Sequence, residues 1–408
     1  MSARTLAILA VAGAVFLLLA VLGERSSAPP ARTSELLLPG LADVVNDLEE
    51  IKVVKAGNET VATLHPAEDG WTVAERDGYP ADLGKLRQSL RALAEARIVE
   101  QKTATPELYE RLGVEDVADA EASGVAVSFS GPGAELPTVI IGDAEGGEYR
   151  YVRRAGEATS WLIDRNPDFP RSTEQWLDRT ILDVRGDRVQ QVTITHPDGE
   201  VVRVYKDERG QTNFTVADVP EGRELQYAGV ANVIGNALRE LNLEDVERAD
   251  DGDGDAPPIE VEYRTFDGLV VRARGFERDD EAWMTFEASV DPEQAARFAP
   301  EDAGGEAADE ASSGETEGDA AEKASPAGDT AAAADGAGDA SATDAAAAAG
   351  EGEDAAAKAP DTSAVEAEAA AINERVAGWR YRIASYQFDQ MTRRMEDLLK
   401  AEAEADDE

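Results

Sequence analysis

The carboxylates that come closest to a metal site in this chain follow a predicted helix in its second half. Asp251, Asp253 and Asp255 alternate with other residues, and Glu262 stands at the twelfth position counted from Asp251. A calcium loop of the EF-hand type has this spacing, but it also needs glycine at its sixth position and a free backbone at its seventh. Alanine and proline stand there, and Glu262 falls within a predicted strand. We interpret the cluster as a solvated acidic turn and keep calcium as the weaker hypothesis.

The two histidines do not indicate catalysis. His65 and His196 each precede a proline at a predicted strand end or turn. A zinc site needs three or four ligands, and the chain has no cysteine. The sequence also lacks a Walker A loop, a Rossmann fingerprint, an HExxH motif and a nucleophile elbow. We therefore predict no catalytic residues, no metal, no cofactor and no enzymatic activity.

Four tryptophans alternate with apolar residues on predicted strands: Trp71, Trp161, Trp283 and Trp379. Packing in the core is the default interpretation of such positions. An aromatic ligand cleft between two lobes is the alternative, although no polar constellation accompanies these residues to orient a ligand.

The elements that must position these residues begin with a predicted hairpin, Glu50–Lys55 and Glu59–His65, and a strand over Trp71–Glu75. Asp82 is a natural N-cap, and the leucines after it recur at helical spacing. The pattern continues with a short helix, four strands and a closing helix, over residues 106–112, 125–129, 138–141, 149–153, 160–164 and 173–182.

The same pattern then starts again. Gln191–Thr195 and Val201–Lys206 predict a second hairpin, and Val230, Ile234, Leu238 and Leu241 repeat the apolar stripe of a helix. Three strands follow, then a fourth strand and a closing helix, over residues 259–264, 269–274, 283–287, 379–388 and 391–400. We interpret this as an internal duplication, and predict an α+β fold of two tandem lobes, each a hairpin, strand, helix, antiparallel meander and helix.

An acidic, alanine-rich insert interrupts the second unit. Lys323 and Lys358 are its basic residues, and few large apolar groups offset the chain entropy, so we predict disorder there. A helix over Glu366–Ala377 is expected to lead into the last strand. The whole chain has 84 acidic and 39 basic residues and a net charge of −45. This field would repel nucleic-acid backbones and anionic lipid surfaces, so we predict no nucleic-acid partner.

The N-terminal run Thr5–Gly23 has no charge. As a helix it would span roughly 28 Å, close to the hydrocarbon thickness of a bilayer. A transmembrane anchor is the first interpretation, and a cleaved signal peptide is the second, although the run is longer than a typical signal core. Arg4 lies before it, whereas Glu24 and Arg25 cancel after it. This favours a single pass with the bulk of the chain outside the cytoplasm.

These observations predict a division of the chain into an anchor, a tether, two repeats, an insert and an acidic tail. The anchor covers residues 1–25 and the tether 26–42. The first repeat covers 43–183, the second 184–298 plus 364–400, the insert 299–363 and the tail 401–408.

The organisation resembles an uncharacterised bacterial family of membrane-anchored proteins with a domain of unknown function. The matching residues are Trp71–Val73, the leucines of 83–93, Tyr109–Val114, Ile140–Asp143 and Tyr149–Val152. Members of this family are typically encoded beside ABC transporters of the gliding-motility type. The resemblance implies an accessory protein of the cell envelope, and it implies no active site.

We therefore expect an extracytoplasmic accessory or scaffold protein of the bacterial inner membrane that acts by binding proteins in the periplasm. Its expected partner is an integral membrane protein, the permease of an ABC transporter. The alternative hypothesis is an envelope ligand-binding module, for a glycan or peptide, with its site in a cleft between the two lobes.

Overall fold

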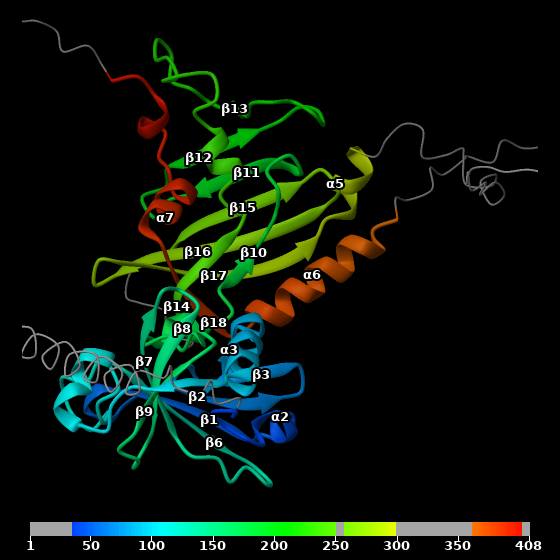
Figure 1. Ribbon diagram of the computed structural model, residues 1–408. Coiled ribbons are helices and arrows are strands. Elements are labelled where there is room, and N and C mark those ends of the chain that lie inside the picture. Colours follow the sequence, from blue (N-terminus) through cyan, green and yellow to red (C-terminus); the bar gives the residue numbers. More distant parts are fainter. Residues whose placement is uncertain (1–34, 250–256, 299–360, 402–408) are drawn as a thin grey trace, which may run out of the picture.

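Two antiparallel β-sheets make up most of this protein in its computed structural model, which describes residues 35–249, 257–298 and 361–401 (Figure 1). The first sheet has nine strands in the order β4-β3-β2-β1-β6-β7-β8-β9-β5. The strands are β1 (Glu50–Lys55), β2 (Glu59–Ala67), β3 (Gly70–Val73), β4 (Tyr79–Pro80), β5 (Ile98–Gln101), β6 (Val125–Ser130), β7 (Val139–Glu145), β8 (Tyr149–Arg154) and β9 (Ser160–Ile163).

Helix α3 (Leu83–Glu95) packs on the first sheet, and the short helix α2 (Leu41–Val44) precedes β1. The Asp82 side chain accepts a hydrogen bond of 2.9 Å from the backbone N–H of Lys85, as the sequence predicts for an N-cap. Leu86, Leu90 and Leu93 lie buried on one face of the helix. Each contributes about 1.5–3 kcal/mol by leaving water.

The second sheet also has nine strands, in the order β10-β14-β18-β17-β16-β15-β11-β12-β13. The strands are β10 (Thr180–Leu182), β11 (Val189–Thr195), β12 (Val201–Tyr205), β13 (Thr215–Val216), β14 (Leu241–Arg248), β15 (Ile259–Thr265), β16 (Leu269–Arg278), β17 (Glu281–Val290) and β18 (Trp379–Ile383). With β4 and β10 set aside, both sheets connect their strands in the same order. We call the half built on the first sheet the first lobe and the other the second lobe.

The helices of the second lobe are α4 (Asn232–Gly235), α5 (Pro292–Arg297), α6 (Ser363–Val376) and α7 (Ser385–Met391). Helix α6 runs along the second sheet against β17 (Figure 1). Its buried side chains are Val365, Ala369, Ile372 and Val376. This helix confirms the one predicted over Glu366–Ala377.

Single 3₁₀ turns complete the described elements, at Ala56–Asn58, Ala74–Arg76, Pro106–Leu108, Glu110–Leu112, Thr173–Trp176 and Glu396–Leu398. They replace predicted helices at three places. The segment 106–112 forms two such turns, and 173–182 forms one turn followed by strand β10. The segment 391–400 begins at the last residue of α7 and contains one turn.

The predicted α+β class is wrong, because antiparallel sheet dominates and helices are few. The clearest error is the second apolar stripe. Ile234 and Leu238 are buried as expected, but α4 is a single turn and Leu241 already belongs to β14. Asn236 ends the turn, and its side chain donates to the Asn232 carbonyl oxygen, a local bond that competes with helix propagation.

The predicted anchor, Thr5–Gly23, lies outside the described residues, as do most of the tether, the acidic insert and the tail. In the parts of the chain that the structure describes, no helix combines the length and the apolar character needed to cross a bilayer.

Candidate functional site

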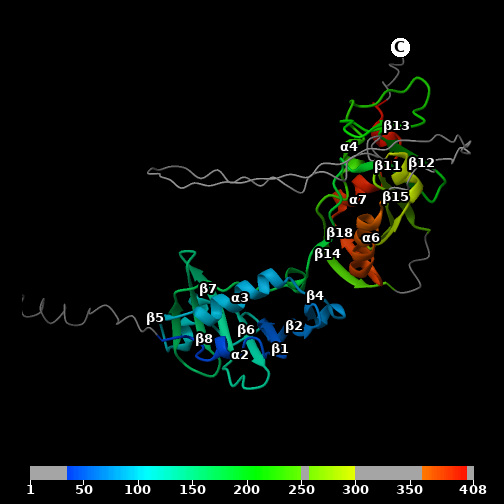
Figure 2. The ribbon, with the colours of Figure 1, turned by 90° about the vertical axis from the view of Figure 1, so that its right-hand side faces the viewer.

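The two lobes share one strand-like segment, residues 176–182, where they meet (Figure 2). On one side, the Trp176 carbonyl accepts from the N–H of Asp82, and the N–H of Asp178 donates to the Pro80 carbonyl, at 2.8 and 2.9 Å. On the other side, β10 pairs with β14 of the second sheet. A segment that is hydrogen-bonded to both sheets cannot swing as a free linker.

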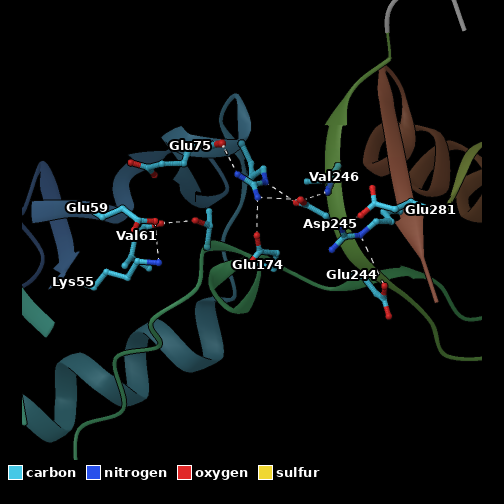
Figure 3. Close-up of polar contacts among 12 residues, drawn as sticks. Lys55, Glu59, Val61, Glu75, Glu174, Glu244, Asp245, Val246 and Glu281 are labelled. Atoms are coloured by element: carbon cyan, nitrogen blue, oxygen red, sulfur yellow. Dashed lines mark hydrogen bonds and ion pairs between the residues drawn. The ribbon is translucent and has the colours of Figure 1, made fainter. Parts of the chain in front are cut away.

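Arg76 forms the charged part of the junction. Its guanidinium donates to both carboxylate oxygens of Asp245 in β14, at 2.5 and 3.0 Å. It also donates to Glu174, at 2.7 Å. Figure 3 shows Glu75 and Glu174 on the first lobe and Asp245 on the facing strand of the second. The hydrogen bond to Asp245 raises the pKa of Arg76, so this cation stays charged while it bridges the lobes.

Aromatic side chains form the apolar part of the junction. Tyr79 of the first lobe meets the ring of Trp379 edge to face, with 4.9 Å between ring centroids. It meets Tyr381 in the same manner at 6.2 Å. Tyr79 and Tyr381 are almost completely buried. Such pairs contribute about 0.5–1.5 kcal/mol each beyond their buried area.

Arg248 closes the rim of the junction. Its guanidinium lies 3.6 Å from the centre of the Trp379 ring and donates to the backbone carbonyl of Asp77, at 3.2 Å. The guanidinium therefore lies over an aromatic ring of its own lobe and is hydrogen-bonded to a turn of the first lobe. The junction therefore combines backbone, ionic and aromatic contacts in one packed interface.

A second cluster gathers the residues that carry the family resemblance. The Tyr109–Val114 segment lies on strands β6 and β7, so closely that a Cβ on Gly142 would stand 2.2 Å from the Leu112 carbonyl oxygen. Arg153 donates to the Val114 carbonyl at 2.8 Å and lies 4.6 Å from the centre of the Tyr109 ring. These contacts hold the segment against the sheet face opposite the main core, where a small separate apolar cluster forms.

The two histidines lie far apart in the fold. His65 is partly exposed in β2, with Nδ1 3.2 Å from the Glu49 carbonyl oxygen. His196 is buried in the β11–β12 turn of the second lobe. Within the described ranges, no group of three or more histidine, aspartate or glutamate side chains could hold a metal ion.

Of the calcium candidates, Asp251, Asp253 and Asp255 lie outside the described residues. Glu262 is described, in β15, where its carboxylate is ion-paired with Arg264 at 2.7 Å and Arg272 at 3.0 Å. Glu262 is the only one of the four candidate carboxylates that the structure describes, and these two arginines already neutralise its charge.

The four tryptophans have different environments. Trp283 and Trp379 are buried, whereas Trp71 and Trp161 are partly buried against the core. Trp379 contacts the other lobe through Tyr79, but as part of a packed contact. A cavity of about 710 Å³ lies elsewhere, within the second lobe, between the β11–β12 turn and α7.

Fold and junction together describe a two-lobe protein of antiparallel sheets whose halves are joined by a connecting segment that is hydrogen-bonded to both sheets. Residues 71–260 of the chain match the family model of a domain of unknown function, DUF4340. The matched range begins at β3 and includes Arg76, the shared segment and Asp245. No curated protein and no solved structure matches the chain.

No sequence pattern indicates the roles of Arg76 and Asp245. Leu241 and Leu243 alternate as in a strand, but a bulge between Leu243 and Asp245 breaks the period of two. For Tyr79 the sequence predicts only extended backbone, because the residue before a proline favours that conformation. The contact of Tyr79 with Trp379 joins positions too distant in sequence for any periodicity to relate them.

Proposed function

We propose that this protein is an extracytoplasmic scaffold of the bacterial inner membrane, anchored through Thr5–Gly23, whose two lobes bind an integral membrane partner. The proposed partner is the permease of an ABC transporter. The observation that supports the proposal is the junction, in which residues 176–182 are hydrogen-bonded to both sheets. A fixed spacing between two lobes serves a protein that holds another protein in place.

The junction also weighs against a binding cleft that opens and closes between the lobes. Hinge closure needs a few residues that absorb large backbone rotations. Here the connecting segment is paired on both sides, and Tyr79 is packed against Trp379. A scaffold needs no such movement, because its function depends on keeping two surfaces at a constant separation.

Crosslinking in native membranes tests the proposal. The full chain, expressed with an affinity tag and crosslinked before detergent extraction, should recover a permease or its ATPase. A variant without residues 1–25 should recover much less, because the anchor places the lobes beside the partner. A variant without residues 301–362 should recover as much as the full chain, if the acidic insert is a spacer. Recovery of neither a permease nor an ATPase by the full chain would contradict the proposal.

A further inference from the structure

Arg393 lies at a cavity in the second lobe and forms no ion pair with the residues that the structure describes. The cavity, of about 710 Å³, is lined by the β11–β12 turn, the facing ends of β15 and β16, and α7 with the segment that follows it. Its volume falls in the range of small-molecule sites, roughly 300–1,000 Å³. Arg393 lines it, and the Nε atom of Arg393 is buried with no hydrogen-bond acceptor in the described part of the chain.

The neighbouring arginines have acidic partners. Arg394 is ion-paired with Asp198 at 2.8 Å and with Glu200. Arg380 is ion-paired with Glu247 at 2.8 Å, and Arg382 with Glu281 at 2.6 Å. The Nε atom of Arg382 is also buried without a hydrogen-bond acceptor among the described residues, so Arg393 differs from it in having no ion pair in the described part of the chain. A guanidinium nitrogen that is removed from water without an acceptor is costly. Arg393 has no acidic partner among the described residues, so its guanidinium is open to an acceptor that is not one of them.

The wall that carries Arg393 is built rigidly. The Arg394 ion pairs tie its segment to the β11–β12 turn, and the Met395 N–H donates to Glu200 at 2.9 Å. His196, only 3% exposed, has Nε2 3.5 Å from the Arg393 carbonyl oxygen. The Nδ1 atom of His196 is also buried without a partner among the described residues. His196 therefore acts as a positioning residue beneath Arg393.

The rest of the lining supplies complementary chemistry. Phe276 and Phe388 provide aromatic surface, and Glu277 and Asp389 provide exposed carboxylates that make no ion pair within the described ranges. Asp397 also lines the cavity, and its carboxylate accepts from the backbone N–H of Arg394 at 2.9 Å. Among the described residues, the lining therefore offers one cation and three carboxylates without an ion pair, together with an apolar surface. A net anion would be repelled by the overall charge of −45, whereas a zwitterion would not.

We infer that this cavity binds a zwitterionic ligand of the amino-acid or short-peptide class. Its carboxylate is received by Arg393, its ammonium group by Asp389 and Glu277, and its side chain lies against Phe276 and Phe388. The site belongs to the second lobe alone, so the inference does not depend on the proposed scaffold function.

Isothermal titration of the full chain in detergent tests the inference, with the dipeptide alanyl-leucine as the probe. The free dipeptide should bind. Its C-terminal amide and its N-acetyl derivative should each bind about tenfold more weakly or less, because each lacks one charge-assisted contact. No binding of the free dipeptide at roughly 20 mM, or equal binding of all three, would overturn the inference.

Variants locate the site. Arg393→Gln should weaken the free dipeptide about tenfold and make binding indifferent to the C-terminal amide. Arg297→Gln is the matched control, since Arg297 is exposed on α5 and does not line the cavity. Wild-type affinity in Arg393→Gln would overturn the inference. If Arg393→Gln does not fold, as judged by circular dichroism, the three probes on the wild-type chain decide.

Competition by inorganic phosphate is a separate test. If phosphate competed as strongly as the dipeptide, the inference would be overturned, because the site would then recognise an anion alone.

Discussion

Arg76 of the first lobe donates hydrogen bonds to both carboxylate oxygens of Asp245 in the second. Their side chains are 23% and 18% exposed, so water screens this pair much less than a surface pair. The contact is the charged half of an interface whose other half is Tyr79 against Trp379 and Tyr381.

Arg76→Ala should lower the free energy of unfolding by about 1–3 kcal/mol, since Asp245 and Glu174 would keep their charges without a partner. Urea denaturation followed by tryptophan fluorescence measures this. Arg91→Ala is the matched control, because the Arg91 side chain is 79% exposed and pairs only within helix α3. An effect of Arg76→Ala no larger than that of Arg91→Ala would show that the pair does not stabilise the junction.

Gly142→Ala should lower the free energy of unfolding by about 3 kcal/mol, because the added Cβ would stand 2.2 Å from the Leu112 carbonyl oxygen. The backbone fixes the positions of both the added Cβ and the carbonyl oxygen, so the clash is relieved only if the segment 109–114 moves off the sheet. Gly84→Ala is the control, since in α3 the new Cβ would come no closer than 3.3 Å to any atom, the nearest being a side-chain oxygen of Asp82. The same urea experiment compares them, and similar midpoints would contradict the tight packing of this segment.

Stability should fall as the pH rises above about 10. Burial raises the pKa of Tyr79 from 10.0 to about 12, and burial also raises the pKa of Tyr381. A pKa raised in the folded state contributes stability that is complete below the unfolded value of 10 and is lost as the pH rises through the folded value. Melting temperatures from pH 8 to 12 measure the loss. Tyr79→Phe should make the decline shallower, and an unchanged slope would count against a buried phenol.

The stability of the second lobe should fall at acidic pH, because here the pKa of a carboxyl group is lowered in the folded state. Burial alone would raise the pKa of Glu247, but hydrogen bonds and charge interactions with Arg278 and Arg380 outweigh it, so the pKa lies below its ordinary 4.5. A lowered pKa contributes stability that is present above 4.5 and is lost as the pH falls towards the folded value. Glu247→Gln should be less stable than wild type at pH 7, and the difference should shrink below pH 4.5. A difference that is constant with pH would refute this assignment.

The sequence predicted well those elements whose signals are local. The β1–β2 hairpin follows from two β-rich runs joined by a turn, and α3 follows from Asp82 and the leucines that face the core. The order in which the strands pair needs contacts between residues far apart in the chain. Strands β5, β10 and β14 cannot be recognised in the sequence because they are short or bulged, and β10 is only three residues long.

The junction could not be predicted for a related reason. Tyr79 and Trp379 are three hundred residues apart, and nothing in their spacing relates them. Arg393 has the sequence environment of an ordinary surface arginine. Only the positions of the charged residues around it show that its neighbour Arg394 has partners and that Arg393 has none in the described part of the chain.

If the two lobes form one rigid body, the distance between them is constant, and this distance can be measured. The chain has no cysteine, so spin labels can be placed at Gln88→Cys on α3 and Ala367→Cys on α6, both exposed helical positions. Pulsed electron–electron double resonance should give one narrow distribution of distances between the two spin labels. This distribution should broaden when Arg76→Ala and Tyr79→Ala are added. A broad or two-peaked distribution in the otherwise unaltered chain would show that the lobes do not form one rigid body.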